Sequence, residues 1–168
     1  MLTYALSTWL YLSKTVETAL IDFKNAGFNH VEIWADKAHL DPRFSPDFES
    51  VYSMVKKYQI KVHSIHAPFH GMAIGSDQSD QVKRSECWLL KTLEYASKLS
   101  ARVMVVHPLT FNFETGSGTL VEMAQELFSR IVSQSENLGV TIAVENMPLA
   151  PLLIHQLKDW LNCFLTQK

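Results

Sequence analysis

Five short apolar segments alternate with longer amphipathic segments along the chain. The short segments are rich in β-branched residues and almost continuously apolar, as expected for parallel strands that are covered by helices. They span residues 2–6, 30–34, 61–67, 102–107 and 140–146. Strand–helix alternation repeated five times predicts an α/β protein with a parallel sheet and right-handed crossovers.

The segments between the predicted strands have apolar residues three and four positions apart, the spacing that buries one face of a helix. We expect the first helix to stop at Gly27, and the second to begin with Ser45 as N-cap and Pro46 at its first position. The predicted buried faces are Val16, Ala19, Leu20 and Phe23; Phe48, Val51 and Val55; Leu89, Leu93 and Ala96; Leu120, Ala124, Leu127, Ile131 and Leu138; and, after Pro151, Leu153, Leu157, Trp160, Leu161 and Phe164.

Composition is that of an ordinary globular protein, with 47% hydrophobic and 19% charged residues in a chain of 168. No low-complexity linker interrupts the pattern, so residues 1–168 are expected to form one domain. The formal net charge of -2 argues against broad nucleic-acid binding but leaves a local basic groove open. No apolar stretch is long enough to predict a membrane span. Cys87 and Cys163 lie in no metal or redox motif, and the simplest interpretation is two reduced thiols in a cytoplasmic protein.

Polar residues and one tryptophan lie where the predicted strands end. Trp34, His66, His107 and Glu145 each lie at or near the last strand residue. The carboxyl ends of parallel strands meet at one edge, where chemistry gathers in α/β folds. Glu145 is the sharpest signal, because it ends the otherwise apolar run VTIAVEN and a buried carboxylate requires a cation, an arginine or several donors. The alternative is a structural salt bridge at the strand end.

Two histidines precede prolines, His66 in HAPF and His107 in HPL. Because proline fixes the direction in which the chain leaves the sheet, each imidazole is expected to face the mouth of the fold. Together with Glu145 they form a ligand set suited to zinc, manganese or iron. The competing interpretation is that both are hydrogen-bonded core histidines.

Glu32 and Trp34 share one face of the second predicted strand by their spacing. Glu32 is a candidate to bind a sugar hydroxyl and Trp34 to form an apolar wall, although Glu32 paired with a neighbouring lysine is an equal alternative. His63 has the opposite parity to His66 and is expected to face the helices. His70 follows HAPF and is expected to be an exposed loop residue, although it is close enough in sequence to reach the mouth.

Three further residues, Asp36, His39 and Asp41, have a spacing that metal ligands adopt. A solvated loop explains the same residues equally well, so they are not assigned to the site.

Four motifs in register, VEIW, HSIHAPF, VMVVHP and IAVENMP, resemble the xylose isomerase-like TIM-barrel superfamily. This superfamily includes sugar-phosphate isomerases and epimerases and the endonuclease IV type of apurinic-site endonucleases. The resemblance implies a divalent metal (Mn, Zn, Co or Mg), with Glu145 matching a fifth-strand metal ligand in both branches. His66 and His107 match histidines that bind zinc in the endonuclease branch and more often line the substrate pocket in the isomerase branch. Trp34, Phe69 and Asn146 are the candidate pocket-lining residues.

The chain departs from this superfamily in length. Eight βα units require roughly 250 residues, and the pattern here provides about five units of a (β/α)8 barrel. The metal ligands of strands six to eight have no counterparts, so the expected site is half built. The open sheet edges predict self-association or a partner chain. Ser100 also stands where a glycine commonly closes the third helix.

Three functions follow as hypotheses. The first is a metal-dependent sugar or sugar-phosphate isomerase or epimerase. In this hypothesis Glu145 holds the metal, and Glu32 and Trp34 position the substrate. The metal polarises the sugar carbonyl, and a carboxylate removes the proton from the adjacent carbon. The second is a zinc-dependent phosphodiester hydrolase that uses His66, His107 and Glu145. The third is a non-catalytic module that depends on a partner. No membrane association is expected.

Overall fold

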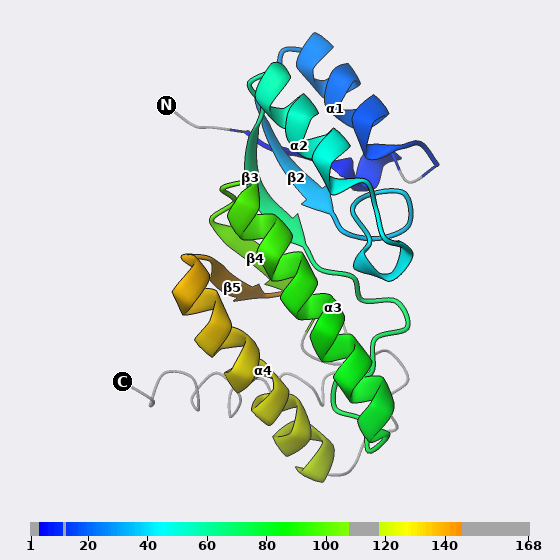
Figure 1. Ribbon diagram of the computed structural model, residues 1–168, viewed down its shortest axis with the longest axis vertical. Helices are drawn as coiled ribbons and strands as arrows, with labels where there is room; N and C mark the ends of the chain where they lie inside the picture. The colour runs from blue at the N-terminus through cyan, green and yellow to red at the C-terminus, as the bar shows by residue number, and fades with distance from the viewer. Residues whose placement is uncertain (1–3, 12, 108–117, 146–168) are drawn as a thin grey trace.

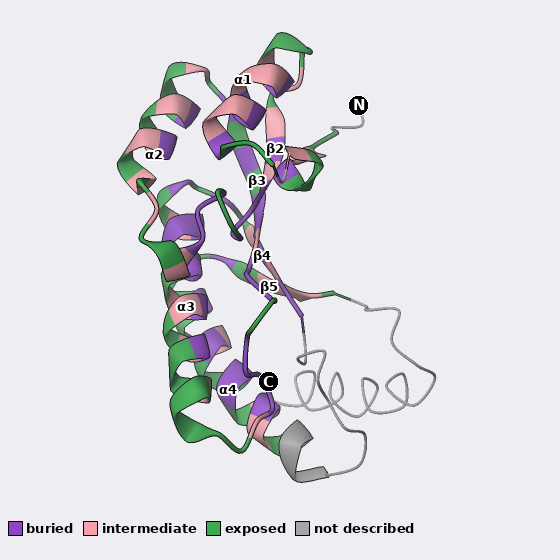
Figure 2. Ribbon diagram, turned by 90° about the vertical axis from the view of Figure 1, so that its right-hand side faces the viewer, coloured by how far each residue is buried: buried purple, intermediate pink, exposed green. Residues whose placement is uncertain are grey.

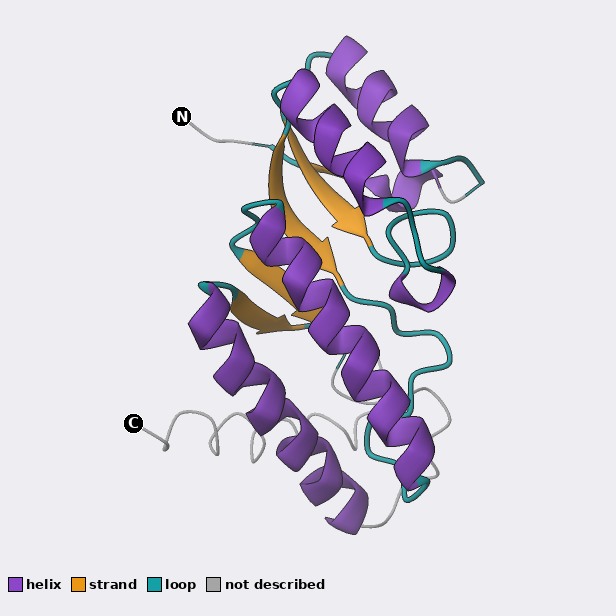
Figure 3. Cartoon of the chain, in the orientation of Figure 1, coloured by secondary structure: helices purple, strands orange, loops and turns teal. Residues whose placement is uncertain are grey.

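The computed structural model describes residues 4–11, 13–107 and 118–145. Strand and helix alternate along the chain (Figures 1 and 3). The strands are β1 (Leu6–Ser7), β2 (His30–Trp34), β3 (Lys61–His66), β4 (Val103–Val106) and β5 (Thr141–Val144). The helices are α1 (Val16–Asn25), α2 (Phe48–Lys57), α3 (Ser79–Lys98) and α4 (Gly118–Leu138), with short 3-10 helices η1 (Thr8–Tyr11) and η2 (Pro42–Phe44).

The strands form one parallel sheet in the order β1-β2-β3-β4-β5. Each strand therefore pairs with its neighbour in sequence, as successive βα units do when they curve into a barrel. The four α-helices lie along one face of the sheet, and the buried positions line the side where helices and strands meet (Figures 1 and 2). The predicted parallel α/β fold of TIM-barrel type is confirmed.

A hydrophobic core joins the sheet to its helices. Its fully buried side chains include Leu20 of α1, Ile65 of β3, Leu93 of α3 and Phe128 of α4. The predicted faces of α1 and α3 are buried as expected. In α4, Ala124, Leu127 and Ile131 are buried, but Leu138 is 38% exposed because it lies at the end of the helix, just before the turn into β5.

A β-bulge sets which side chains share a face at the centre of the sheet. Val31 pairs with Val62, but the next residue, Glu32, pairs with Ser64, so His63 is left without a partner in the β2–β3 register. Residues paired across parallel strands point to the same side. The bulge consequently places Ser64 beside Glu32 and, two positions on, His66 beside Trp34.

Two predicted boundaries are wrong. The first strand comprises Leu6–Ser7, not residues 2–6, and residues 1–3 lie outside the described part. The second helix begins at Phe48 with Asp47 as N-cap, whose side chain accepts a hydrogen bond from the Ser50 amide at 3.0 Å. Ser45 cannot act as that cap because it closes η2 in a left-handed conformation. The helix predicted after Pro151 lies outside the described residues.

Candidate metal centre

His66, His107 and Glu145 come from the carboxyl ends of three adjacent strands. His66 is the last residue of β3, and His107 and Glu145 directly follow β4 and β5. Backbone bonds hold these ends together, from the Ala67 amide to the Val105 carbonyl and from the Glu145 amide to the Val106 carbonyl. The parallel sheet therefore brings together three side chains that are up to 79 residues apart in sequence.

The three side chains converge on one carboxylate oxygen. Nε2 of His66 and Nε2 of His107 each lie 2.9 Å from Oε2 of Glu145. The potential ligand atoms of all three residues lie within 4.8 Å of one another, and they are the one group of this kind among the described residues. The histidine side chains are nearly buried, whereas that of Glu145 is 43% exposed.

Electrostatics favour an ionised Glu145 carboxylate and a neutral His107 ring. Burial raises the pKa of Glu145, but the hydrogen bond with His66 and the positive charge that His107 and His66 carry when protonated outweigh it, so the pKa lies below its ordinary value. Burial is also the main reason why the pKa of His107 lies below that of an ordinary histidine, with His66 acting in the same direction. These are the protonation states that metal ligands require.

The orientation of His66 fits a bound cation. Its Nδ1 lies 2.8 Å from the Ala67 carbonyl, which only accepts, so Nδ1 carries the hydrogen. In the neutral ring Nε2 then has a lone pair, and this lone pair faces the ionised Glu145 oxygen. Two electron-rich atoms this close need a proton or a cation between them. A backbone carbonyl that fixes the second nitrogen is also a common outer partner of metal-bound histidine.

The cluster opens into a cavity of about 630 Å³. Glu32, Trp34 and Phe69, for which the sequence suggested a role in contacting substrate, line this cavity. Glu32 accepts a hydrogen bond from the Ser64 hydroxyl at 2.9 Å, and within the described part of the chain it forms no ion pair with a lysine. The Phe69 ring stacks on His107 with centroids 4.2 Å apart, so an apolar wall directly adjoins the polar cluster. Asn146 lies outside the described residues.

The sequence did not predict the wall of the cavity that residues 5–7, Trp9 and Leu10 form, and it left the place of His70 open. Trp9 lies in η1, and its ring packs against Trp34 at 4.0 Å between centroids. His70 is exposed, as predicted, but it also reaches the cavity, a possibility that its place after HAPF had left open. His63 is exposed and is not buried beneath the helices, because it is the extra residue of the bulge.

Asp36, His39 and Asp41 do not form a solvated loop. All three are buried, with exposed fractions of 2%, 1% and 0%. Arg43 binds both carboxylates, and His39 bonds to the Lys14 carbonyl through Nε2 at 2.9 Å. A metal site at these residues is not supported either, because Arg43 occupies both carboxylates and the group of potential metal ligands found among the described residues is His66, His107 and Glu145. The sequence signal for this arrangement was Arg43 itself, two residues after Asp41.

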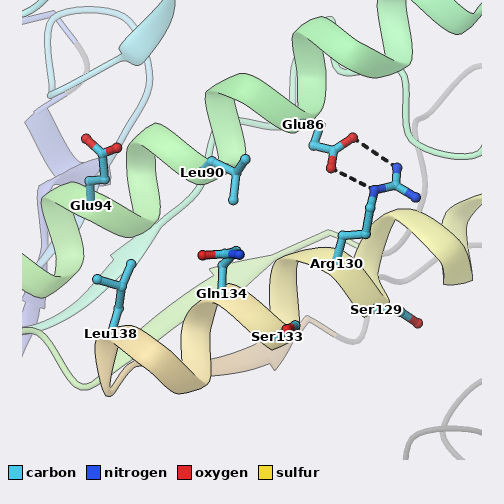
Figure 4. Close-up of a pocket in the computed structure, with 8 residues that line it drawn as sticks. All are labelled: Glu86, Leu90, Glu94, Ser129, Arg130, Ser133, Gln134 and Leu138. Carbon is cyan, nitrogen blue, oxygen red and sulfur yellow. Dashed lines mark hydrogen bonds and ion pairs between the residues drawn. The ribbon is translucent and has the colours of Figure 1, made fainter.

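A second hollow, of about 560 Å³, lies between α3 and α4 (Figure 4). Arg130 closes one end by binding both carboxylate oxygens of Glu86, at 2.7 and 2.9 Å. The hydrogen bond from Arg130 lowers the pKa of Glu86 below its ordinary value. The hollow lies on the helical layer, so it is separate from the strand ends.

A parallel α/β sheet with potential metal ligands at the carboxyl ends of its strands defines a protein of TIM-barrel type. The family model described as Xylose isomerase-like TIM barrel matches residues 21–162, and the chain belongs to this family. None of the described helices is both long enough and apolar enough to cross a membrane.

Known proteins similar to this chain are about twice as long. The uncharacterized protein MJ1311 of Methanocaldococcus jannaschii is 26% identical in an alignment of 151 residues that covers 86% of this chain and 49% of that protein. A D-tagatose 3-epimerase-like protein matches with a TM-score of 0.74 at 22% identity, over 89% of this chain and 55% of its own. D-allulose 3-epimerase from Methylomonas sp. has the same TM-score at 16% identity, over 96% and 59%. The chain thus spans about half the length of these relatives.

Proposed function

We propose that this chain provides the first half of a metal-dependent ketose epimerase or isomerase site, acting on a small sugar or sugar phosphate. The observation that carries the proposal is the convergence of His66, His107 and Glu145 at the edge of a cavity with an aromatic wall. Family membership and the sugar 3-epimerases among the similar structures support the same class of substrate.

His66, His107 and Glu145 would hold one divalent cation, since two imidazoles and a carboxylate form a three-ligand set that leaves further positions open. The cation supplies Lewis-acid polarisation of a sugar carbonyl. We propose that the cation is Mn²⁺, Co²⁺, Zn²⁺ or Mg²⁺.

Glu32 is proposed as the group that handles the proton. Among the described residues lining the cavity, Glu32 and Glu145 are the carboxylates, and Glu145 is taken up by the histidines. The Ser64 hydroxyl orients the Glu32 carboxylate by donating to Oε2. Glu32 takes a proton from the carbon beside the carbonyl and leaves an enediolate. Water or an acid from further strands of the site, on the opposite face, returns a proton to that carbon and completes an epimerisation. Trp34 and Phe69 exclude water from the step at Glu32.

The test is exchange of the C3 hydrogen of D-allulose, D-fructose or D-tagatose with solvent deuterium, followed by NMR with Mn²⁺ or Co²⁺ present. We expect exchange by the unaltered chain, loss of exchange with retained metal in Glu32→Gln, and loss of both in Glu145→Gln. Glu122→Gln, an exposed position on α4, is the matched control and should behave as the unaltered chain. If the chain neither binds any of the three sugars nor exchanges their C3 hydrogen, the proposal is contradicted.

A second candidate, zinc-dependent phosphodiester hydrolysis, is favoured by one observation, the two imidazoles on a single carboxylate oxygen. More than one zinc ion per chain, together with hydrolysis of a phosphodiester, would favour it over the epimerase.

A further inference from the structure

His70 lies at the side of the cavity beyond the metal-ligand cluster. Its ring centroid is 4.0 Å from that of Phe69, and the same Phe69 ring lies 4.2 Å from His107. His70 also contacts the edge of Trp34, with centroids 6.3 Å apart. Its side chain remains 55% exposed. A ligand that extends from the cluster of His66, His107 and Glu145 across the face of the Phe69 ring therefore contacts His70.

Asp36 sets the orientation of the His70 ring through a hydrogen bond. Nδ1 of His70 lies 3.0 Å from Oδ2 of Asp36, whose side chain is 3% exposed. An ionised carboxylate only accepts hydrogen bonds, so Nδ1 carries the hydrogen. In the neutral ring Nε2 is then an acceptor, the same consequence that a buried aspartate has on the histidine of a catalytic dyad.

Asp36 is itself fixed. Its Oδ1 accepts from the Lys37 amide at 2.8 Å and from Arg43. Burial raises the pKa of Asp36, but His70 and Arg43 outweigh it and the pKa lies below its ordinary value, so the carboxylate stays ionised. Arg43 also donates to the His70 carbonyl. The guanidinium therefore joins the loop after β2 to the loop after β3, and it holds both the backbone and the ring partner of His70.

We propose that His70 is a substrate-contacting residue, with Asp36 and Arg43 as its positioning residues. Nε2 of His70 accepts a hydrogen bond from a hydroxyl of a polyhydroxylated ligand whose other end lies at His66, His107 and Glu145. The inference rests on the proposed function, because it assigns one more contact to the same sugar.

Two substitutions separate this role from a purely structural one. In His70→Asn the amide NH2 replaces Nδ1–H, keeping the bond to Asp36, but nothing replaces Nε2. In His70→Gln the amide carries a polar group to the Nε2 position, while the bond to Asp36 is lost. A substrate contact predicts that Asn weakens ketose binding more than Gln does. A role only in holding the loop predicts the reverse order.

The probe is D-allulose or D-fructose, titrated by NMR or calorimetry into the full chain loaded with Mn²⁺ or Co²⁺. We expect His70→Asn to weaken sugar binding about fivefold, the effect of one neutral hydrogen bond, with metal affinity unchanged. Equal binding by both variants and the unaltered chain, or stronger loss in Gln than in Asn, overturns the inference but not the proposed function. Sugar that binds none of the three proteins overturns both.

The tautomer gives a readout that does not depend on any sugar. Long-range ¹H–¹⁵N spectra distinguish imidazole protonated at Nδ1 from imidazole protonated at Nε2. We expect the Nδ1–H form for His70 in the unaltered chain and a shift away from it in Asp36→Asn. An Nε2–H form in the unaltered chain overturns the inference directly.

Discussion

Oε2 of Glu145 meets two imidazole nitrogens, each at 2.9 Å, and this crowding is the residue-level feature on which the site depends. In its neutral form His66 offers no hydrogen at Nε2, because the Ala67 carbonyl accepts its Nδ1–H. A proton on Nε2 or a cation bound by all three atoms satisfies this contact, and the metal role proposed above is the second of these. The proposed metal role therefore comes from hydrogen-bond accounting in addition to residue type.

His39 provides a residue-scale prediction on pH. Burial holds the pKa of His39 below the ordinary histidine value. The unfolded chain then binds a proton more readily than the folded chain, so folding stability is complete above about pH 6.5 and declines as the pH falls below it. In His39→Gln, which keeps a donor for the Lys14 carbonyl, the decline should be smaller. Urea unfolding at about pH 7.5 and about pH 5.5 measures the difference; an unchanged decline would contradict the assignment.

At the scale of residues, the sequence predicted those side chains whose position follows from strand period and strand end. Glu32 and Trp34 line one cavity because they are two positions apart on one strand and share a face. His66, His107 and Glu145 come together because the carboxyl ends of adjacent parallel strands meet at one edge of the sheet. The burial of Asp36 was not predictable in the same way. It depends on Arg43 and on His70, which lies 34 residues away from Asp36 on another loop.

At the scale of elements, all four α-helices end in the same manner. A residue one or two positions after the end of each helix has a positive φ: 87° at Gly27, 52° at Gln59, 57° at Ser100 and 67° at Gly139. The next amide in each case bonds back five residues, as Ala101 does to the Ala96 carbonyl at 2.9 Å. This is the Schellman motif, in which glycine is preferred because the left-handed conformation is unfavourable for other residues.

Ser100→Gly is therefore predicted to stabilise the fold by about 0.5 to 1 kcal/mol, since glycine removes the cost of the left-handed conformation. The converse change, Gly139→Ser, has open space around its Cβ and should destabilise by a similar amount through the backbone alone. Urea unfolding of both variants measures the two effects. A destabilising Ser100→Gly would show that the serine side chain matters more than the backbone conformation.

Element types were predictable from periodicity, but the start of α2 and the register of β3 were not. The choice of Asp47 over Ser45 as N-cap depends on η2, a short 3-10 helix that occupies the residues before it. The bulge at His63 leaves no mark in the alternation of apolar residues. Both features depend on how one element meets its neighbour, which the periodicity of a single segment does not record.

At the scale of the whole molecule, the described sheet has two strands with a single neighbour, β1 and β5. Unpaired edges favour pairing with another strand. Trp9 and Leu10, beside β1, are large apolar residues that are 47% and 67% exposed, and both line the cavity. Further strands placed here would extend the wall of the proposed site. The chain covers 55% and 59% of two similar structures, a D-tagatose 3-epimerase-like protein and a D-allulose 3-epimerase, so those chains have room for such further elements.

We therefore predict that the isolated chain associates with itself, or with a partner that supplies further strands. Sedimentation velocity over a range of concentrations should show species larger than one chain. Leu10→Lys, which places a charge on the exposed apolar surface beside β1, should reduce the association, whereas Phe44→Lys, at a 71% exposed aromatic residue of η2 outside the cavity lining, is the control. A single monomeric species at all concentrations would contradict the prediction.

The central claim is that His66, His107 and Glu145 hold one divalent cation, and metal analysis of the chain tests it most directly. The chain is stripped with chelator, reloaded separately with Mn²⁺, Co²⁺ and Zn²⁺, freed of excess metal and measured by plasma mass spectrometry. The account predicts close to one bound ion per chain. Because Glu145 would bind the metal directly, Glu145→Gln should lower the metal affinity by more than the roughly 10- to 100-fold that follows loss of a residue that only supports a ligand. Equal metal content in Glu145→Gln and the unaltered chain, or no bound metal in either, would contradict it.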